Sequence, residues 1–250
     1  MNNNFDKLLN DKQHGATYIL NNIINYIYNN SLLPQDYIKL SELIINSYPA
    51  MAQMYHLSYK LKLLGEGKLK NIEEINGYFL KSRKHSKENC LKLLYQLKPI
   101  KITTISHSSL VINLLTEYSK HNHISITIGE GYPANEGIIA AKILKRKNIE
   151  VRIVKDEHLK LSAEKTDLIL TGADATGNEW FINKQGTMEL LLAGALSGIK
   201  TVVCSSSDKI IIPKILNYNY DTDFLIKNRK KIKEHFFEII PKSIVTQFIS

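Results

Sequence analysis

KITTISHSSLVINLLTEYSKHNHISITIGEGYPANEGIIAAKILKRKNIEVRIVKD, residues 101–156, is the stretch of sequence that decides the fold. Short runs rich in β-branched residues (KITTIS, ISITIGE, EVRIVKD) alternate in it with helical patterns of about 10–15 residues. The alternation continues over residues 167–207 through DLILTGAD, QGTMELLLAGALSGI and KTVVCSSS. Continuous apolar strands separated by helices are typical of a parallel sheet covered on both faces. The sequence therefore predicts a doubly wound α/β domain.

The preceding part of the chain has a helical pattern. Apolar residues recur at spacings of three and four between residues 11 and 97, without the alternation typical of strands. Pro34 and Pro49 are expected at helix starts. We therefore predict a helical domain at residues 1–97, followed by the α/β domain at residues 98–250.

The composition indicates a folded protein without a metal site or a membrane span. Of 250 residues, 44% are hydrophobic and 23% are charged, as in a chain with a sizeable core. Cys90 and Cys204 show no CxxC spacing, so neither a zinc site nor a disulfide framework is indicated. No window reaches the roughly 18 apolar residues of a spanning helix, and the N-terminus lacks a secretory signal. We predict a cytoplasmic protein with no cofactor.

The net charge of +9 and the isoelectric point near 9.3 are compatible with an acidic partner, either nucleic acid or a phosphorylated ligand. Lysine is spread through the whole chain, however. The densest basic run, KNRKKIK at residues 227–233, is expected on an exposed helix or loop, and such runs are usually solvated faces. We therefore do not expect nucleic-acid binding.

Polar residues follow three of the predicted strands. Residues 106–109 (SHSS) follow the first, residues 130–133 (EGYP) the second, and Asp174 the fourth. Ligands of open parallel sheets bind beyond the carboxyl ends of the strands, where loops and helix N-termini gather. We therefore expect these residues at one binding site.

The SHSS segment has two interpretations. Hydroxyls and free amides at a helix N-terminus form an anion site, so Ser108 and Ser109 are candidates for binding a phosphate. An N-terminal serine cap would explain Ser106 or Ser108 equally well. His107 is likewise either a general base or a polar cap residue. The segment alone does not decide between these possibilities.

Asp174 comes directly after Gly172 and Ala173 at a strand end, where a tight turn would hold it partly away from water. Such a carboxylate can have a pKa suited to proton transfer, although an Asx turn is the alternative. Lys184, just before the next helix, offers a charge for a phosphate, and Asn183 offers a donor and an acceptor for a sugar hydroxyl. We expect these side chains to flank one pocket.

These residues resemble a known family: the translation initiation factor 2B alpha, beta and delta subunits, with methylthioribose-1-phosphate isomerase and ribose-1,5-bisphosphate isomerase. The similar motifs are GAD at 172–174, NKQGT at 183–187, EGYPANEG at 130–137 and FEIIPKSIVTQFI near the C-terminus, with DKQHGATYIL at 11–20 a weaker one. The resemblance implies an N-terminal helical domain, a Rossmann-like C-terminal domain, and a homodimer or higher homo-oligomer formed through that second domain.

In the isomerases of this family, a cysteine after the first strand and the aspartate of GAD move hydrogen between C1 and C2 of a phosphorylated aldose. The resemblance implies Asp174 for that aspartate, but Ser106 stands in the place of the cysteine, and a hydroxyl is a much weaker acid than a thiol. It also assigns Glu130 to the substrate site, with Tyr132 in place of an arginine. Tyr48 stands where the isomerases carry an arginine-rich phosphate loop.

Two functions remain open. The first is a regulatory or non-catalytic protein that binds a phosphorylated sugar or a nucleoside phosphate, as the changes at Ser106 and Tyr132 indicate. The second is an aldose-ketose isomerase acting on a pentose 1-phosphate or 1,5-bisphosphate. In that reading Asp174 is one acid/base group, and Ser106 or His107 is the other.

Overall fold

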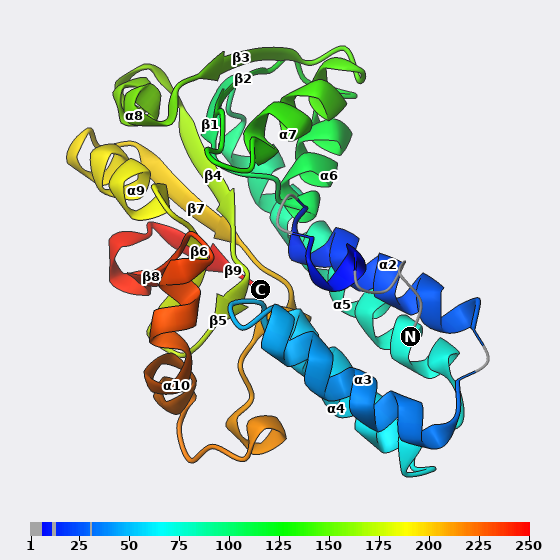
Figure 1. The fold of residues 1–250 in the computed structure, drawn as a ribbon. Coiled ribbons are helices and arrows are strands. Elements are labelled where there is room, and N and C mark those ends of the chain that lie inside the picture. The colour runs from blue at the N-terminus through cyan, green and yellow to red at the C-terminus, as the bar shows by residue number, and fades with distance from the viewer. Residues whose placement is uncertain (1–6, 12–13, 31) are drawn as a thin grey trace.

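The computed structural model describes residues 7–11, 14–30 and 32–250. Two parts of the molecule are seen in Figure 1: a layer of long helices, and a twisted sheet with helices on both faces. Positions 12 and 13 of the stretch that resembles the first family helix lie outside the described residues. No helix in the described ranges is both long enough and apolar enough to span a membrane.

Among the described residues, four long helices form the first layer. They are α2 (Ala16–Tyr28), α3 (Pro34–Ser47), α4 (Ala52–Gly65) and α5 (Ile72–Leu97). Helix α3 begins at Pro34 as predicted, since proline lacks the amide that the first helical turn leaves unused. Helix α4 begins only at Ala52, so the start predicted at Pro49 is wrong by part of a turn.

Helix α5 joins the two parts. Asn71 caps it by accepting a hydrogen bond from the amide of Glu74. Its first half, through Ile75 and Phe79, packs in the core of the helical layer, while Cys90 and Leu94 belong to the core beneath the sheet. Because one helix contributes to both cores, the domain boundary after residue 97 stays a prediction.

The main sheet has six strands, all parallel. In chain order they are β1 (Lys101–Thr104), β2 (Ser125–Gly129), β3 (Glu150–Val154), β4 (Leu168–Gly172), β7 (Lys200–Cys204) and β9 (Gln247–Ile249). Their order across the sheet is β3-β2-β1-β4-β7-β9. This is a doubly wound order that reverses between β1 and β4, and the predicted fold class is confirmed.

Helices cover both faces of this sheet (Figure 1). Helices α6 (Ser109–Tyr118) and α7 (Glu136–Lys145) share a core with the end of α5, and α9 (Thr187–Leu196) packs on the opposite face. Shorter elements complete the chain: α8 (Asp156–Leu159), η1 (Lys160–Lys165), η2 (Ser207–Lys209), η3 (Pro213–Leu216) and η4 (Lys242–Ile244). The order reversal places the loops after β1 and β4 side by side.

A second, antiparallel sheet was not predicted. It consists of β5 (Ala175–Thr176), β6 (Trp180–Lys184) and β8 (Phe237–Pro241), and α10 (Asp221–Glu234) packs beside it. All five residues of β6 are buried. The strand therefore lacks the alternation of apolar and polar residues that is typical of a strand with one solvent-exposed face. Its last two residues, Asn183 and Lys184, reach the carboxyl edge of the main sheet.

The basic run at 227–233 lies on α10, mostly exposed as expected.

Candidate functional site

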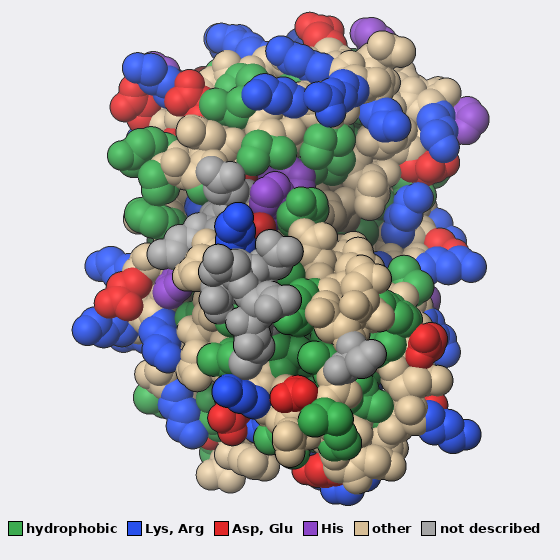
Figure 2. Space-filling model, turned by 45° about the vertical axis from the view of Figure 1, so that its right-hand side comes forward, with side chains coloured by type: hydrophobic (Ala, Val, Ile, Leu, Met, Phe, Trp, Pro, Cys, Tyr) green, Lys and Arg blue, Asp and Glu red, His purple; other side chains and the backbone are tan. Residues whose placement is uncertain are grey.

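A cavity of about 300 Å³ lies where the helical layer meets the carboxyl edge of the sheet. The space-filling view shows histidine and hydrophobic side chains gathered in this middle region (Figure 2). The helical part supplies residues around Gly15 and Tyr48, the sheet supplies its strand-end loops, and residues 235–237 close one side. The cavity thus depends on both parts of the chain.

Seven of the predicted site residues line this cavity. They are Ser106, His107, Ser108, Ser109, Asp174, Asn183 and Lys184. Glu130 and Tyr132 are not among the described residues that line it. The carbonyl of Glu130 accepts hydrogen bonds from the first turn of α7, and Tyr132 is 79% exposed, with its amide bound to Asp156. A role for these two residues in binding stays a prediction without support from this geometry.

The loop after β1 holds its serines in different ways. Ser108 caps α6 by accepting a hydrogen bond from the Val111 amide, so the capping interpretation holds for this residue. A Cβ atom on Gly172 would lie 2.4 Å from Ser108 Oγ, which explains the glycine at the end of β4. Ser106 has φ of 67°, a left-handed conformation that is uncommon for non-glycine residues.

His107 is buried, with 7% of its surface exposed. Neither ring nitrogen has a hydrogen-bond partner within the described part of the chain. Burial lowers the pKa of His107, and the neighbouring His14 lowers it further. A neutral imidazole at this position is able to accept a proton from a ligand.

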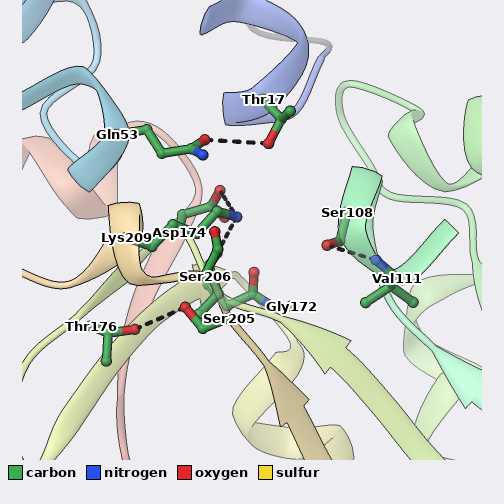
Figure 3. A network of polar contacts seen from close by, with 12 residues as sticks. Thr17, Gln53, Ser108, Val111, Gly172, Asp174, Thr176, Ser205, Ser206 and Lys209 are labelled. Carbon is green, nitrogen blue, oxygen red and sulfur yellow. Dashed lines mark hydrogen bonds and ion pairs between the residues drawn. The ribbon is translucent and has the colours of Figure 1, made fainter. Parts of the chain in front are cut away.

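Asp174 lies against a lysine that the sequence did not reveal as a site residue. Figure 3 shows Lys209 of η2 next to Asp174, with its Nζ donating a hydrogen bond to the carbonyl of Ala173. The distance from Lys209 Nζ to Asp174 Oδ1 is 4.0 Å, and both side chains are largely buried. Burial raises the pKa of Asp174, although Lys209 and Lys184 act in the opposite direction. This carboxyl group therefore holds a proton more readily than an exposed one.

A buried network fixes η2, the element that carries Lys209. Asp208 is fully buried and accepts hydrogen bonds from Gln53 Nε2, at 2.6 Å, and from the hydroxyl of Ser206. Gln53 belongs to α4 and accepts in turn from Thr17 of α2, 3.3 Å away, as Figure 3 shows. The network connects the helical layer to the loop after β7, so it fixes the positions of the two walls of the cavity relative to each other.

Lys184 is engaged in a buried ion pair. Its Nζ lies 2.9 Å from Glu136 Oε1, and the side chains are only 9% and 6% exposed. The rings of Phe236 and Phe237 flank the same ammonium group at 5.7 and 5.6 Å. Burial raises the pKa of Glu136, with Lys184 opposing the change. Lys184 thus has a carboxylate partner that its sequence position did not indicate, and its predicted role in binding a phosphate stays a prediction.

Asn183 and Tyr48 complete the polar wall of the cavity. The amide nitrogen of Asn183 donates to the hydroxyls of Thr171 and Thr187, at 2.8 and 3.1 Å, which orients the side chain. The hydroxyl of Tyr48 donates to the carbonyl of Leu8, and burial raises the pKa of this tyrosine. Both side chains are therefore fixed before any ligand arrives.

The raised pKa of Asp174 has a measurable consequence for stability. A folded-state pKa above the unfolded one means that ionisation of Asp174 destabilises the fold as the pH rises above the ordinary carboxyl value of about 4. We expect Asp174→Asn to melt at a higher temperature than the parent at pH 7–8, and the difference to shrink towards pH 4. Thermal melts over this pH range, with the exposed Glu157→Gln as the control, would measure it. A constant difference would contradict the assignment.

Among the described residues, no cluster of three or more histidine, cysteine or acidic side chains is arranged to hold a metal ion. Cys90 and Cys204 are both free and buried. A hydrogen bond with the adjoining Cys90, together with burial, raises the pKa of the Cys204 thiol, so it is poorly suited to act as a thiolate. Asp174 and His107 are two of the titratable side chains that line the cavity and are able to move a proton.

The chain belongs to the initiation factor 2 subunit family, whose sequence profile matches residues 35–249. Proteins described as translation initiation factor eIF-2B subunit 2-like from Pyrococcus furiosus and Pyrococcus horikoshii are 25% and 24% identical to it, over 214 and 227 residues. The alignments cover 82% and 88% of this chain, and 77% and 81% of the relatives. The family resemblance noted in the motifs is confirmed.

Solved structures show the same fold. The translation initiation factor eIF-2B of P. horikoshii superimposes with a TM-score of 0.75 and 17% identity, covering 98% of this chain and 92% of the other. A tetrameric eIF2B-beta2-delta2 complex from C. thermophilum gives a TM-score of 0.61 at 9% identity, covering 92% of this chain and 79% of the other. At these sequence identities the similarity establishes the fold alone. The chemistry of the site has to be argued from the residues of this chain.

Proposed function

We propose that this family member binds a small phosphorylated ligand, either a sugar phosphate or a nucleoside phosphate, in the cavity at the carboxyl edge of the sheet, and acts through that binding without turnover. The observation that carries the proposal is the composition of the cavity. It combines the N-terminal turn of α6 with two buried lysines, Lys184 and Lys209, and with the polar side chain of Asn183.

The charges of the cavity are compatible with a phosphate. Free amides and the helix dipole at the start of α6 favour an anion. Three carboxyl groups of the described residues line the cavity and oppose one. Asp11 is paired with His14 at 2.8 Å, and burial raises the pKa of Glu136 and Asp174, so proton uptake can remove the repulsion of these two. Lys184 and Lys209 then become available to the ligand. Position 106 has a serine where the isomerases have a cysteine, and the lack of a thiol there supports binding over catalysis.

An aldose-ketose isomerase is the second candidate. Asp174 supports it, because a buried carboxyl group with a raised pKa is suited to proton transfer. His107 supports it as well, since its ring nitrogens are unpaired within the described part of the chain. The two candidates differ in whether the unmodified protein converts a bound aldose phosphate.

The experiment that separates them is a turnover assay beside a thermal-shift assay. The compounds are ribose 1,5-bisphosphate, ribose 1-phosphate and methylthioribose 1-phosphate. Stabilisation without product formation is expected, because a ligand that binds only the folded state raises the melting temperature. Product formation by the purified parent protein would favour the isomerase. The absence of stabilisation by any phosphorylated sugar or nucleotide would overturn the binding proposal.

We further propose that the protein assembles into a homo-oligomer through the outer face of α9. Met188, Leu192 and Leu196 are 36%, 41% and 89% exposed, and their spacing of four places them along one stripe. Exposed apolar patches of this kind mark protein interfaces.

This surface gives a prediction for the oligomeric state. We expect Leu192→Glu to convert a dimer of the parent protein into a monomer, because the carboxylate would be buried against an apolar partner. Light scattering coupled to gel filtration measures the mass of both, and Ile226→Glu on α10, 76% exposed in the parent, is the control. A parent protein that is monomeric at micromolar concentration would contradict the proposal.

A further inference from the structure

A second hollow, of about 530 Å³, lies between α2, α5 and α6, beside the cavity described above. Arg83, Lys84 and Lys87 of α5 line it, and Lys209 contributes from η2. No aspartate or glutamate is among the described residues that line it. A groove with several cations and no carboxylate attracts anions.

The guanidinium of Arg83 is held in a fixed position at this groove. Its Nη1 donates to Asn21 Oδ1 and its Nε donates to the carbonyl of Phe79, both at 3.1 Å. Its Nη2 is buried and has no hydrogen-bond partner among the described residues. A buried donor left unpaired destabilises the fold, so an anionic oxygen placed beside it would be favoured. A fixed guanidinium also loses little side-chain entropy on binding.

Further donors surround the inner end of the groove. His107, whose ring nitrogens are both unpaired within the described part of the chain, lines the groove as well as the cavity. Ser109 and Leu110 form the first turn of α6, where amides lack partners inside the helix. Lys87 lies 3.6 Å from Glu117, but this pair is exposed and weak. The groove therefore offers a convergent set of donors to an anion.

The groove also has an apolar wall. Leu80 and Tyr18, 55% and 43% exposed, lie on either side of it, and Leu110 and Ile143 line its sheet side. A simple inorganic anion would leave these side chains facing water. An anion that carries an apolar or aromatic group would cover them.

We propose that this groove is a second ligand site, which binds a phosphate monoester carrying an apolar or aromatic group. The three basic residues of α5 do not line the first cavity, so the site goes beyond the function proposed above. His107 and Lys209 line both spaces, so the two ligands would share one wall.

The test is isothermal titration calorimetry of the full chain with phenyl phosphate, and with inorganic phosphate for comparison. Saturable binding of phenyl phosphate is expected, and Arg83→Gln should weaken it about tenfold or more through the loss of a charged hydrogen bond. The control is Lys81→Gln, which removes an exposed cation from the same helix outside the groove and should bind like the parent. Inorganic phosphate should bind more weakly than phenyl phosphate, and equal affinities would refute the role of the apolar wall.

Two more variants keep the result interpretable. If Arg83→Gln does not fold, the double variant Lys84→Gln/Lys87→Gln decides, because removing both cations should also weaken binding. The double variant Lys184→Met/Glu136→Met alters only the first cavity and should bind phenyl phosphate as the parent does. If the cavity variant loses binding of phenyl phosphate while the groove variants keep it, the proposal is overturned. The phenyl phosphate would then be bound in the first cavity. No saturable binding by the parent, or equal affinity of groove variants and control, would overturn it too.

Discussion

Ser106→Cys is expected to raise the rate of aldose-ketose isomerisation by about 100-fold or more over the parent, since general acid-base catalysis contributes about 10²–10⁴. Ser106 lines the cavity together with Asp174, and its left-handed backbone positions its side chain in the loop after β1. A thiol near a helix N-terminus ionises more readily than one in water, whereas a serine hydroxyl stays protonated. Product formation from ribose 1,5-bisphosphate, ribose 1-phosphate and methylthioribose 1-phosphate is the measurement.

Two further variants test whether the gain belongs to this site. Asp174→Asn in the Ser106→Cys background should abolish it, because an amide keeps the shape of the carboxyl group but cannot transfer a proton. Ser109→Cys places a thiol at another position of the cavity wall and should stay inactive. A Ser106→Cys protein that binds a sugar phosphate but remains inactive would show that the loss of the thiol is not the only departure from the isomerases.

The parallel sheet was predictable because each strand and helix carries its own local signal. The apolar runs of β1, β2 and β4 are separated by helical patterns, and the strands are parallel, as that alternation predicts. The antiparallel sheet lacks such a signal, since β6 is buried on both faces and its partner β8 lies far along the chain. Its existence depends on tertiary pairing that local pattern does not encode.

The site was predictable where residues directly follow a strand. Ser106 and Asp174 were found by that rule, since each lies two residues after the end of its strand. Lys209 comes later, at the end of η2 beyond β7, so the rule did not reveal it. Glu136 is different. It faces Lys184 only because α7 and β6, which are distant in the sequence, meet at the cavity, and nothing local distinguishes it from Glu130. Partners of buried charges are therefore the part of a site that sequence patterns reveal least.

The ion pair between Lys184 and Glu136 gives the largest expected change in stability. Lys184→Met should lower the free energy of unfolding by about 3–5 kcal/mol, because it leaves a buried carboxylate without its counter-ion. The double variant Lys184→Met/Glu136→Met should recover most of that loss, since two apolar side chains of similar length replace the pair. The exposed pair of Lys160 and Glu189, with a distance of 2.6 Å, is the matched control.

Lys160→Met should cost no more than about 1 kcal/mol, as exposed ion pairs do. Urea unfolding of the three variants and the parent measures these differences, and equal losses for Lys184→Met and Lys160→Met would contradict the buried pair. The double variant also tests binding, because it should fold yet lack a positive charge at position 184. If Lys184 binds the phosphate of the ligand, sugar phosphates should no longer raise the melting temperature of this variant. A shift equal to that of the parent would leave Lys184 with a structural role alone and assign the phosphate to Lys209 and the start of α6.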